Sequence, residues 1–148
     1  MTQPFLDRCI FLAASGGIGS FVETVAVTGF QTVENGGGTN GQTLYYAAQS
    51  DDLSQWEVGQ GVWSSVTLTL TRATVFFNSI GTTAKINFTQ PPQVMVTIPA
   101  ETLLTSTYPV TNTSNGVQGQ TARDPNGNFY VCYEDGAWTQ FLGISPFP

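Results

Sequence analysis

The sequence predicts an all-β fold, an antiparallel β-sandwich or flattened barrel that is followed by a linker and a small β-hairpin appendage. Three observations lead to this prediction. Apolar and polar residues alternate in several short runs, and clusters of Gly, Asn, Asp and Ser separate those runs. In addition, no window of about a dozen residues combines a helical period with capping residues.

The alternation defines the expected strands of the first part of the chain. Residues 9–14 form a short apolar run that we interpret as a strand, because it is too short for a signal peptide and no basic region precedes it. Residues 21–27 alternate as well, although Glu23 interrupts their apolar face. Further runs with one apolar and one polar face cover residues 66–71, 85–89 and 93–98.

Turn residues lie between these strands. Glycine supplies positive φ, and Asn and Asp side chains hydrogen-bond to their own backbone, so clusters of these residues reverse the chain. Such clusters cover residues 15–20, 35–41, 50–52 and 78–81.

The stretch WEVGQGVW, residues 56–63, combines two tryptophans with two glycines. It begins like a nucleotide-binding loop, but the third glycine and the following helix of such a loop are missing, which disfavours phosphate binding. Alternation instead places Trp56 and Val58 on one face of a strand and Glu57 on the other. Gly59 and Gly61 indicate a β-bulge or the close approach of another backbone.

The chain is expected to contain a β-sandwich module over residues 1–103, a linker over 104–116 and a small β unit over 117–148. The linker is rich in Thr, Ser and Asn and has little to bury. In the last unit, residues 129–133 and 138–142 form a hairpin across a turn that contains Asp135-Gly136.

Composition excludes several function classes. The net charge is −6, from ten acidic and four basic residues, and charged residues are 9% of the chain. The bases do not cluster, which disfavours binding to nucleic acid or to an anionic membrane surface. No apolar run reaches the roughly 18 residues of a membrane span. The four bases are Arg8, Arg72, Lys85 and Arg123.

The sequence predicts no catalytic residue, cofactor or metal. Without histidine, a Ser-His-Asp or Cys-His arrangement cannot form, and a zinc site is disfavoured. The two cysteines, Cys9 and Cys132, are expected to be reduced core residues. The acidic pairs at 51–52 and 134–135 are interpreted as turn residues, and the loop at 124–128 lacks the later acidic ligand of a calcium loop.

Aromatic side chains are the candidate contact residues. Tyr45, Tyr46 and the three tryptophans are expected at the core or at a subunit interface. An exposed tryptophan could also stack on a sugar ring. The candidate interface or binding residues are Trp56, Trp63, Trp138, Tyr45 and Tyr46.

An ordered set of strings over residues 5–101 resembles a β-rich module that recurs in virion structural proteins of tailed bacteriophages. The strings are Asp7-Arg8, 27–33, 44–47, 56–61, 70–75, 78–79, 86–88 and 96–101. Residues 117–148 resemble a second, short phage module. Members of the first family usually follow Asp-Arg with a polar, Thr-rich strand, whereas this chain has the apolar run 9–14, which we expect to be buried.

The resemblance implies a non-enzymatic virion protein that forms a symmetric homo-oligomer and binds other virion proteins. It would be made in the host cytoplasm and reside in the virion, as a tail-associated adaptor, hub or fibre anchor. Two alternatives remain open, a capsid decoration or cement protein and a glycan-binding receptor-recognition module. Low charge suits such assembly, because identical subunits then repel each other little.

Overall fold

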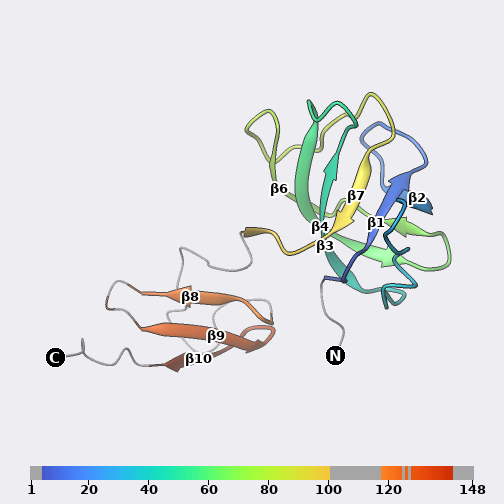
Figure 1. Ribbon diagram of the computed structural model, residues 1–148. Coiled ribbons are helices and arrows are strands. Elements are labelled where there is room, and N and C mark those ends of the chain that lie inside the picture. The colour runs from blue at the N-terminus through green and yellow to red at the C-terminus, as the bar shows by residue number, and fades with distance from the viewer. Residues whose placement is uncertain (1–4, 101–117, 125, 127, 142–148) are drawn as a thin grey trace. The chain divides into compact units, whose positions relative to one another are not determined.

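The computed structural model describes residues 5–100, 118–124, 126 and 128–141. The chain divides into two compact units, Met1–Pro99 and Ala100–Pro148, which are described separately below. The linker expected at 104–116 lies outside the described residues. All regular elements within the described part are antiparallel strands (Figure 1), so the all-β prediction is confirmed.

The first unit is a small closed β-barrel. Its sheet has the order β3-β7-β1-β2-β5-β4-β6, and an additional β3–β4 pairing joins the two sides into a ring, with β6 extending from β4. Figure 1 shows the strands curving around a common interior. The strands are β1 (Ile10–Ala13), β2 (Phe21–Ala26), β3 (Thr43–Gln49), β4 (Trp56–Ser64), β5 (Thr69–Leu70), β6 (Thr74–Asn78) and β7 (Gln93–Val96).

Aromatic and branched side chains fill the barrel. The ring of Phe21 packs edge-on against Tyr46, with centroids 5.4 Å apart, and Phe11 contacts Trp63 at 6.5 Å. Such offset and edge-on arrangements are the favoured geometries of aromatic pairs. Strand β1 belongs to this core, so the expected burial of the apolar run is confirmed for residues 9–13, of which Leu12 is half-buried, whereas Ala14 is exposed.

The expected strand at 66–71 is mostly wrong. Only Thr69–Leu70 is a strand, β5, and residues 65–68 form the turn that connects it to β4. Trp63 pairs with Leu70 and Ser64 with Thr69, so the chain must reverse within the four residues between them. Val66 is therefore 84% exposed and Leu68 adopts a positive φ of 49°.

The expected strand at 85–89 is also absent, apart from a single bridge between Phe88 and Gly17. The alternation nevertheless identified the inward side chains, because Ile86 and Phe88 are both buried in the core. No ladder forms at Ile86 because side chains occupy its backbone groups: its N–H donates to Glu57, and its carbonyl accepts from Arg72. Strand β7 likewise ends at Val96, before Ile98.

The second unit is a three-stranded antiparallel sheet in the order β10-β9-β8. Strands β9 (Phe129–Glu134) and β10 (Ala137–Phe141) form the hairpin that the sequence predicted, and Gly136 in its turn has a φ of 72°. Strand β8 (Thr121–Arg123) pairs with β9. Ala122, Cys132 and Trp138 form its buried cluster.

Candidate functional site

The five predicted contact residues do not gather in one place. Trp63 and Tyr46 lie inside the barrel, and Trp138 belongs to the buried cluster of the second unit. Tyr45 points out of the barrel from β3 but is nearly covered, because its ring packs against Phe76 at 6.0 Å. Trp56 is the one with a substantial exposed surface, at 37%.

Trp56 belongs to an apolar band on the outside of the barrel. Its ring lies 5.9 Å from that of Phe77 on β6. The strand registers then place Phe77 beside Val58, and Ala47 beside both Val58 and Met95, so the band crosses β6, β4, β3 and β7. Phe77 and Met95 are both exposed. We call Trp56, Phe77, Val58, Ala47 and Met95 the outer apolar band.

The alternation predicted for WEVGQGVW is confirmed. Trp56 and Val58 face outward, whereas Glu57 and Trp63 face inward. Both interpretations of the glycines also hold. A bulge interrupts the pairing with β6 between Val58 and Gly59, and a Cβ at Gly59 would lie 2.3 Å from the carbonyl oxygen of Thr74. The stretch therefore builds the sheet, and its glycines bring neighbouring backbones close.

The inward carboxylate of Glu57 is completely buried and fully hydrogen-bonded. Its Oε1 accepts the Tyr46 hydroxyl at 2.9 Å and the Arg72 Nε–H at 2.7 Å. Its Oε2 accepts the Ile86 N–H at 2.8 Å and an Arg72 Nη2–H. Burial, followed by the charge of the Glu57 carboxylate, raises the pKa of the Tyr46 phenol, so Tyr46 stays a donor.

Arg72 completes this network, with 1% of its surface exposed. Besides the bidentate pair with Glu57, its guanidinium donates to the carbonyls of Gly17, Gly19 and Ile86 at 3.1, 3.2 and 2.7 Å. All five of its N–H donors thus have acceptors. The guanidinium also lies over the rings of Phe21 and Phe88, at 4.9 and 5.6 Å from their centroids.

The Glu57–Arg72 network is a structural cross-link. It ties β3 and β4 to the β1–β2 loop and to the segment after β6, which lacks a ladder of its own. Neither charged side chain offers a surface to a substrate, since both are buried. Sequence reasoning missed this pair. Its one signal was the placement of Glu57 opposite two apolar neighbours in an alternating strand.

A second buried carboxylate, Glu23 on β2, holds the loop between β2 and β3. It accepts the Val33 N–H at 3.3 and 3.4 Å. Burial raises the pKa of Glu23; the Val33 N–H lowers it, and the nearby Glu34 raises it further. Burial, followed by the charge of Glu23, also raises the pKa of the Cys9 thiol to about 12, which keeps that thiol protonated.

The raised pKa of Glu23 predicts a pH dependence of stability. The folded state disfavours the ionised form, so the free energy of unfolding falls as the pH rises from the ordinary value of 4.5 through the folded-state pKa. Glu23→Gln should remove this slope, raising the melting temperature near pH 7 and leaving it unchanged near pH 3. Thermal unfolding of both proteins from about pH 3 to 7 measures this. A wild-type slope that persists in Glu23→Gln contradicts the prediction.

Of the two acidic pairs predicted to lie in turns, Asp51, Asp52 and Asp135 do so, whereas Glu134 is the last residue of β9. Asp52 accepts hydrogen bonds from Ser50 and Ser54, and Asp135 accepts the Gln118 N–H at 2.8 Å. Within the described residues, no group of three or more His, Cys, Asp or Glu side chains is arranged to hold a metal ion. Cys9 and Cys132 are free and buried, as expected.

The described part of the chain contains no helix with the length and apolar character needed to span a membrane. Comparison with known protein families, with curated proteins and with solved structures finds no significant match to this chain.

Proposed function

We propose that this protein is a non-enzymatic structural component of a tailed-bacteriophage virion, which assembles with copies of itself and with other virion proteins. A tail-associated position is our first choice, and capsid decoration is the alternative. The virion assignment rests on the ordered strings at residues 5–101 and 117–148. The assembly role is carried by the outer apolar band.

The outer apolar band supports assembly for a physical reason. Exposed apolar surface that is contiguous across several strands marks an interaction site, whereas scattered exposed apolar side chains need no explanation. The band includes two aromatic rings, and aromatic residues are enriched where proteins meet. The barrel beneath is closed and cross-linked by the Glu57–Arg72 pair, which gives the band a rigid support.

The test is to look for the chain in purified particles of the phage whose genome encodes it. We expect quantitative mass spectrometry to find a fixed copy number per particle, and a high-resolution map to show a neighbouring chain covering Trp56 and Phe77. A chain that is abundant in the lysate but missing from purified particles overturns the proposal.

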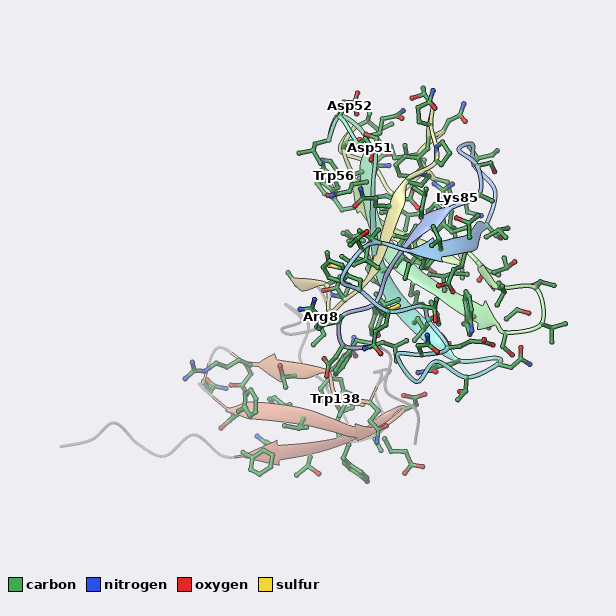
Figure 2. The ribbon with its side chains drawn as sticks, turned by 45° about the vertical axis from the view of Figure 1, so that its right-hand side comes forward. Arg8, Asp51, Asp52, Trp56, Lys85 and Trp138 are labelled. Carbon is green, nitrogen blue, oxygen red and sulfur yellow. The ribbon has the colours of Figure 1, made fainter. Side chains whose placement is uncertain are left out.

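The same map separates the receptor-recognition alternative from assembly. Trp56 favours that alternative, because an exposed ring can stack on a sugar, and Figure 2 shows Asp51 and Asp52 at the same end of the barrel. If Trp56 faces outward from the particle with no protein over it, glycan binding becomes the better explanation.

A further inference from the structure

The two ends of the barrel carry different chemistry. Gln49 pairs with Gln93 and Tyr46 with Val96, so the β3–β4 turn lies at one end and the start of β1 and the end of β7 lie at the other. Figure 2 shows the same separation, with Asp51 and Asp52 at one end of the first unit and Arg8 at the other. We call residues 50–55 the turn end. We call the residues at the other end, 5–10, Phe30 and 95–98, the pocket end.

The pocket end contains a cavity of about 340 Å³. Its lining is mostly apolar, and the charged residues that border it are Arg8 and Asp7. The Arg8 guanidinium donates to the carbonyl of Gly29 and lies over the ring of Phe30, 5.1 Å from its centroid. Among the described residues, Gly29 is the only acceptor that it has, which leaves donors for a further partner. Apolar lining residues include Leu6, Ile10, Phe30, Met95 and Ile98.

Arg8 is held in an uncommon conformation, with a φ of 52°. Its backbone is fixed there because its carbonyl accepts the Gln31 N–H at 2.7 Å. For residues other than glycine, this left-handed region is unfavourable and persists only where the surroundings impose it. The pocket end therefore presents one positioned cation beside an apolar hollow.

The turn end presents the complementary features. Leu53 is 63% exposed and also has a positive φ, of 61°. Its N–H donates to the Ser50 carbonyl at 3.0 Å, and Asp52 accepts from Ser50 and Ser54, so the turn is internally braced. Asp51 and Asp52 directly precede Leu53 and are exposed. The exposed Leu53 side chain, which we call the knob, therefore stands beside two carboxylates.

A further exposed apolar side chain lies at the turn end. Ile80, 70% exposed, follows β6 in the loop whose Ser79 N–H donates to the Trp56 carbonyl at 2.9 Å. That hydrogen bond places the loop at the turn end. Phe30, Met95 and Ile98 are the exposed apolar residues that border the cavity at the opposite end.

We propose that copies of this chain associate head to tail, with Leu53 of one copy in the cavity of the next and Asp51 and Asp52 facing Arg8. The inference rests on the proposed function, because it identifies the surface used for self-assembly. Charge argues for a second copy as the occupant. Arg8 is one of only four bases in a chain of net charge −6, and Arg72 is buried in its own ion pair. Asp7 is the single acid in the lining of the cavity, and the turn end adds two carboxylates, Asp51 and Asp52, for Arg8 together with an apolar side chain for the hollow.

Head-to-tail contact has a consequence for symmetry. Because two different surfaces meet, the contact does not close at a dimer; it produces a ring if the rotation closes and an open filament if it does not. The charged part of the contact also predicts that added salt weakens association.

The experiment uses two variants of the full chain. Leu53→Asn removes the knob and also suits the positive φ at that position, so it should not destabilise the fold. Ile98→Asp places a carboxylate beside the cavity, where it repels the incoming acids. Leu68→Asn is the matched control, because Leu68 is also exposed and has a φ of 49° but lies in the β4–β5 turn.

Analytical ultracentrifugation up to about 1 mM chain, where even weak specific contacts form, measures the outcome. We expect wild type and Leu68→Asn to form species beyond the dimer, and Leu53→Asn and Ile98→Asp each to associate at least about tenfold more weakly. An equimolar mixture of these two variants should form a one-to-one dimer and stop there, since it contains one intact knob and one intact cavity per pair.

A monomeric wild type, or a Leu53→Asn variant that assembles like wild type, overturns the inference, and so does a mixture that stays monomeric. None of these results removes the chain from the virion, which the particle analysis decides separately. If Leu53→Asn assembles normally while a Phe77 variant does not, self-assembly stands and the outer apolar band is its surface.

Discussion

Arg72→Met is expected to lower the free energy of unfolding of the barrel by about 3–5 kcal/mol, the range measured when one partner of a buried ion pair is removed. The substitution leaves the Glu57 carboxylate at 0% exposure without its counter-charge. It also leaves the carbonyls of Gly17, Gly19 and Ile86 without the donor that they share. Urea unfolding followed by tryptophan fluorescence measures the change. A Trp138→Phe background removes the signal of the second unit.

A double-mutant cycle then separates the ion pair from the rest of the network. Glu57→Met alone should also be strongly destabilising, but Glu57→Met combined with Arg72→Met should lose less than the sum of the two, because no buried charge remains. It should not recover fully, since the Ile86 N–H and the Tyr46 hydroxyl lose their acceptor. Additive losses would show that the two side chains do not act as a pair.

Lys85→Met is the matched control for Arg72→Met. Lys85 is exposed, and changes at such positions usually alter stability by no more than about 0.5 kcal/mol. A loss for Lys85→Met that equals the loss for Arg72→Met would attribute the effect to net charge, and would contradict the explanation based on burial.

The sequence was sufficient to predict what depends on local pattern. Period-two alternation identified β2, β4, β7 and the β9–β10 hairpin, because one face of each strand is buried and the other is not. It also identified Ile86 and Phe88 as inward residues in a segment that forms no strand. Burial follows the alternation, whereas a ladder additionally requires a free neighbouring edge.

Two features could not be predicted because they depend on distant parts of the chain. The Glu57–Arg72 pair joins residues 15 positions apart, and its third partner, Ile86, lies 29 positions from Glu57. Nothing in the spacing of Val66 to Leu70 reveals that β4 folds back onto β5 there. The turn is imposed by closure of the barrel, which overrides the strand preference of alternating Val, Leu and Thr.

The candidate contact residues illustrate the same limit. Composition predicted that aromatic residues matter for contacts, but Trp56 and Trp63 lie on opposite faces of one strand because their positions differ by an odd number. The interior face of this strand is the one that carries Glu57, because Glu57 pairs with the buried Arg72 inside the barrel. Nothing in the sequence indicated that Leu53 would project from the turn, since its positive φ is visible only in the fold.

Gly61→Ala is expected to destabilise the barrel by about 3 kcal/mol or more, as severe overpacking does. A Cβ at Gly61 would lie 1.6 Å from the carbonyl oxygen of Thr71, so the two backbones must separate. That movement breaks two hydrogen bonds between them, from the Thr71 N–H to the Val62 carbonyl at 3.0 Å and from the Val62 N–H to the Thr71 hydroxyl at 2.7 Å.

Because Arg72 follows Thr71 directly, the damage from Gly61→Ala should extend to the buried ion pair. When Gly61→Ala is combined with Arg72→Met, the loss in the free energy of unfolding should therefore be smaller than the sum of the two separate losses, since each substitution disturbs the same network. Gly19→Ala is the control, because a Cβ there meets no atom within 4 Å and no positive φ is required. It should change stability by no more than about 0.5 kcal/mol in the same urea titration. Equal losses for Gly61→Ala and Gly19→Ala would mean that the close approach of β4 to Thr71 does not hold the barrel together.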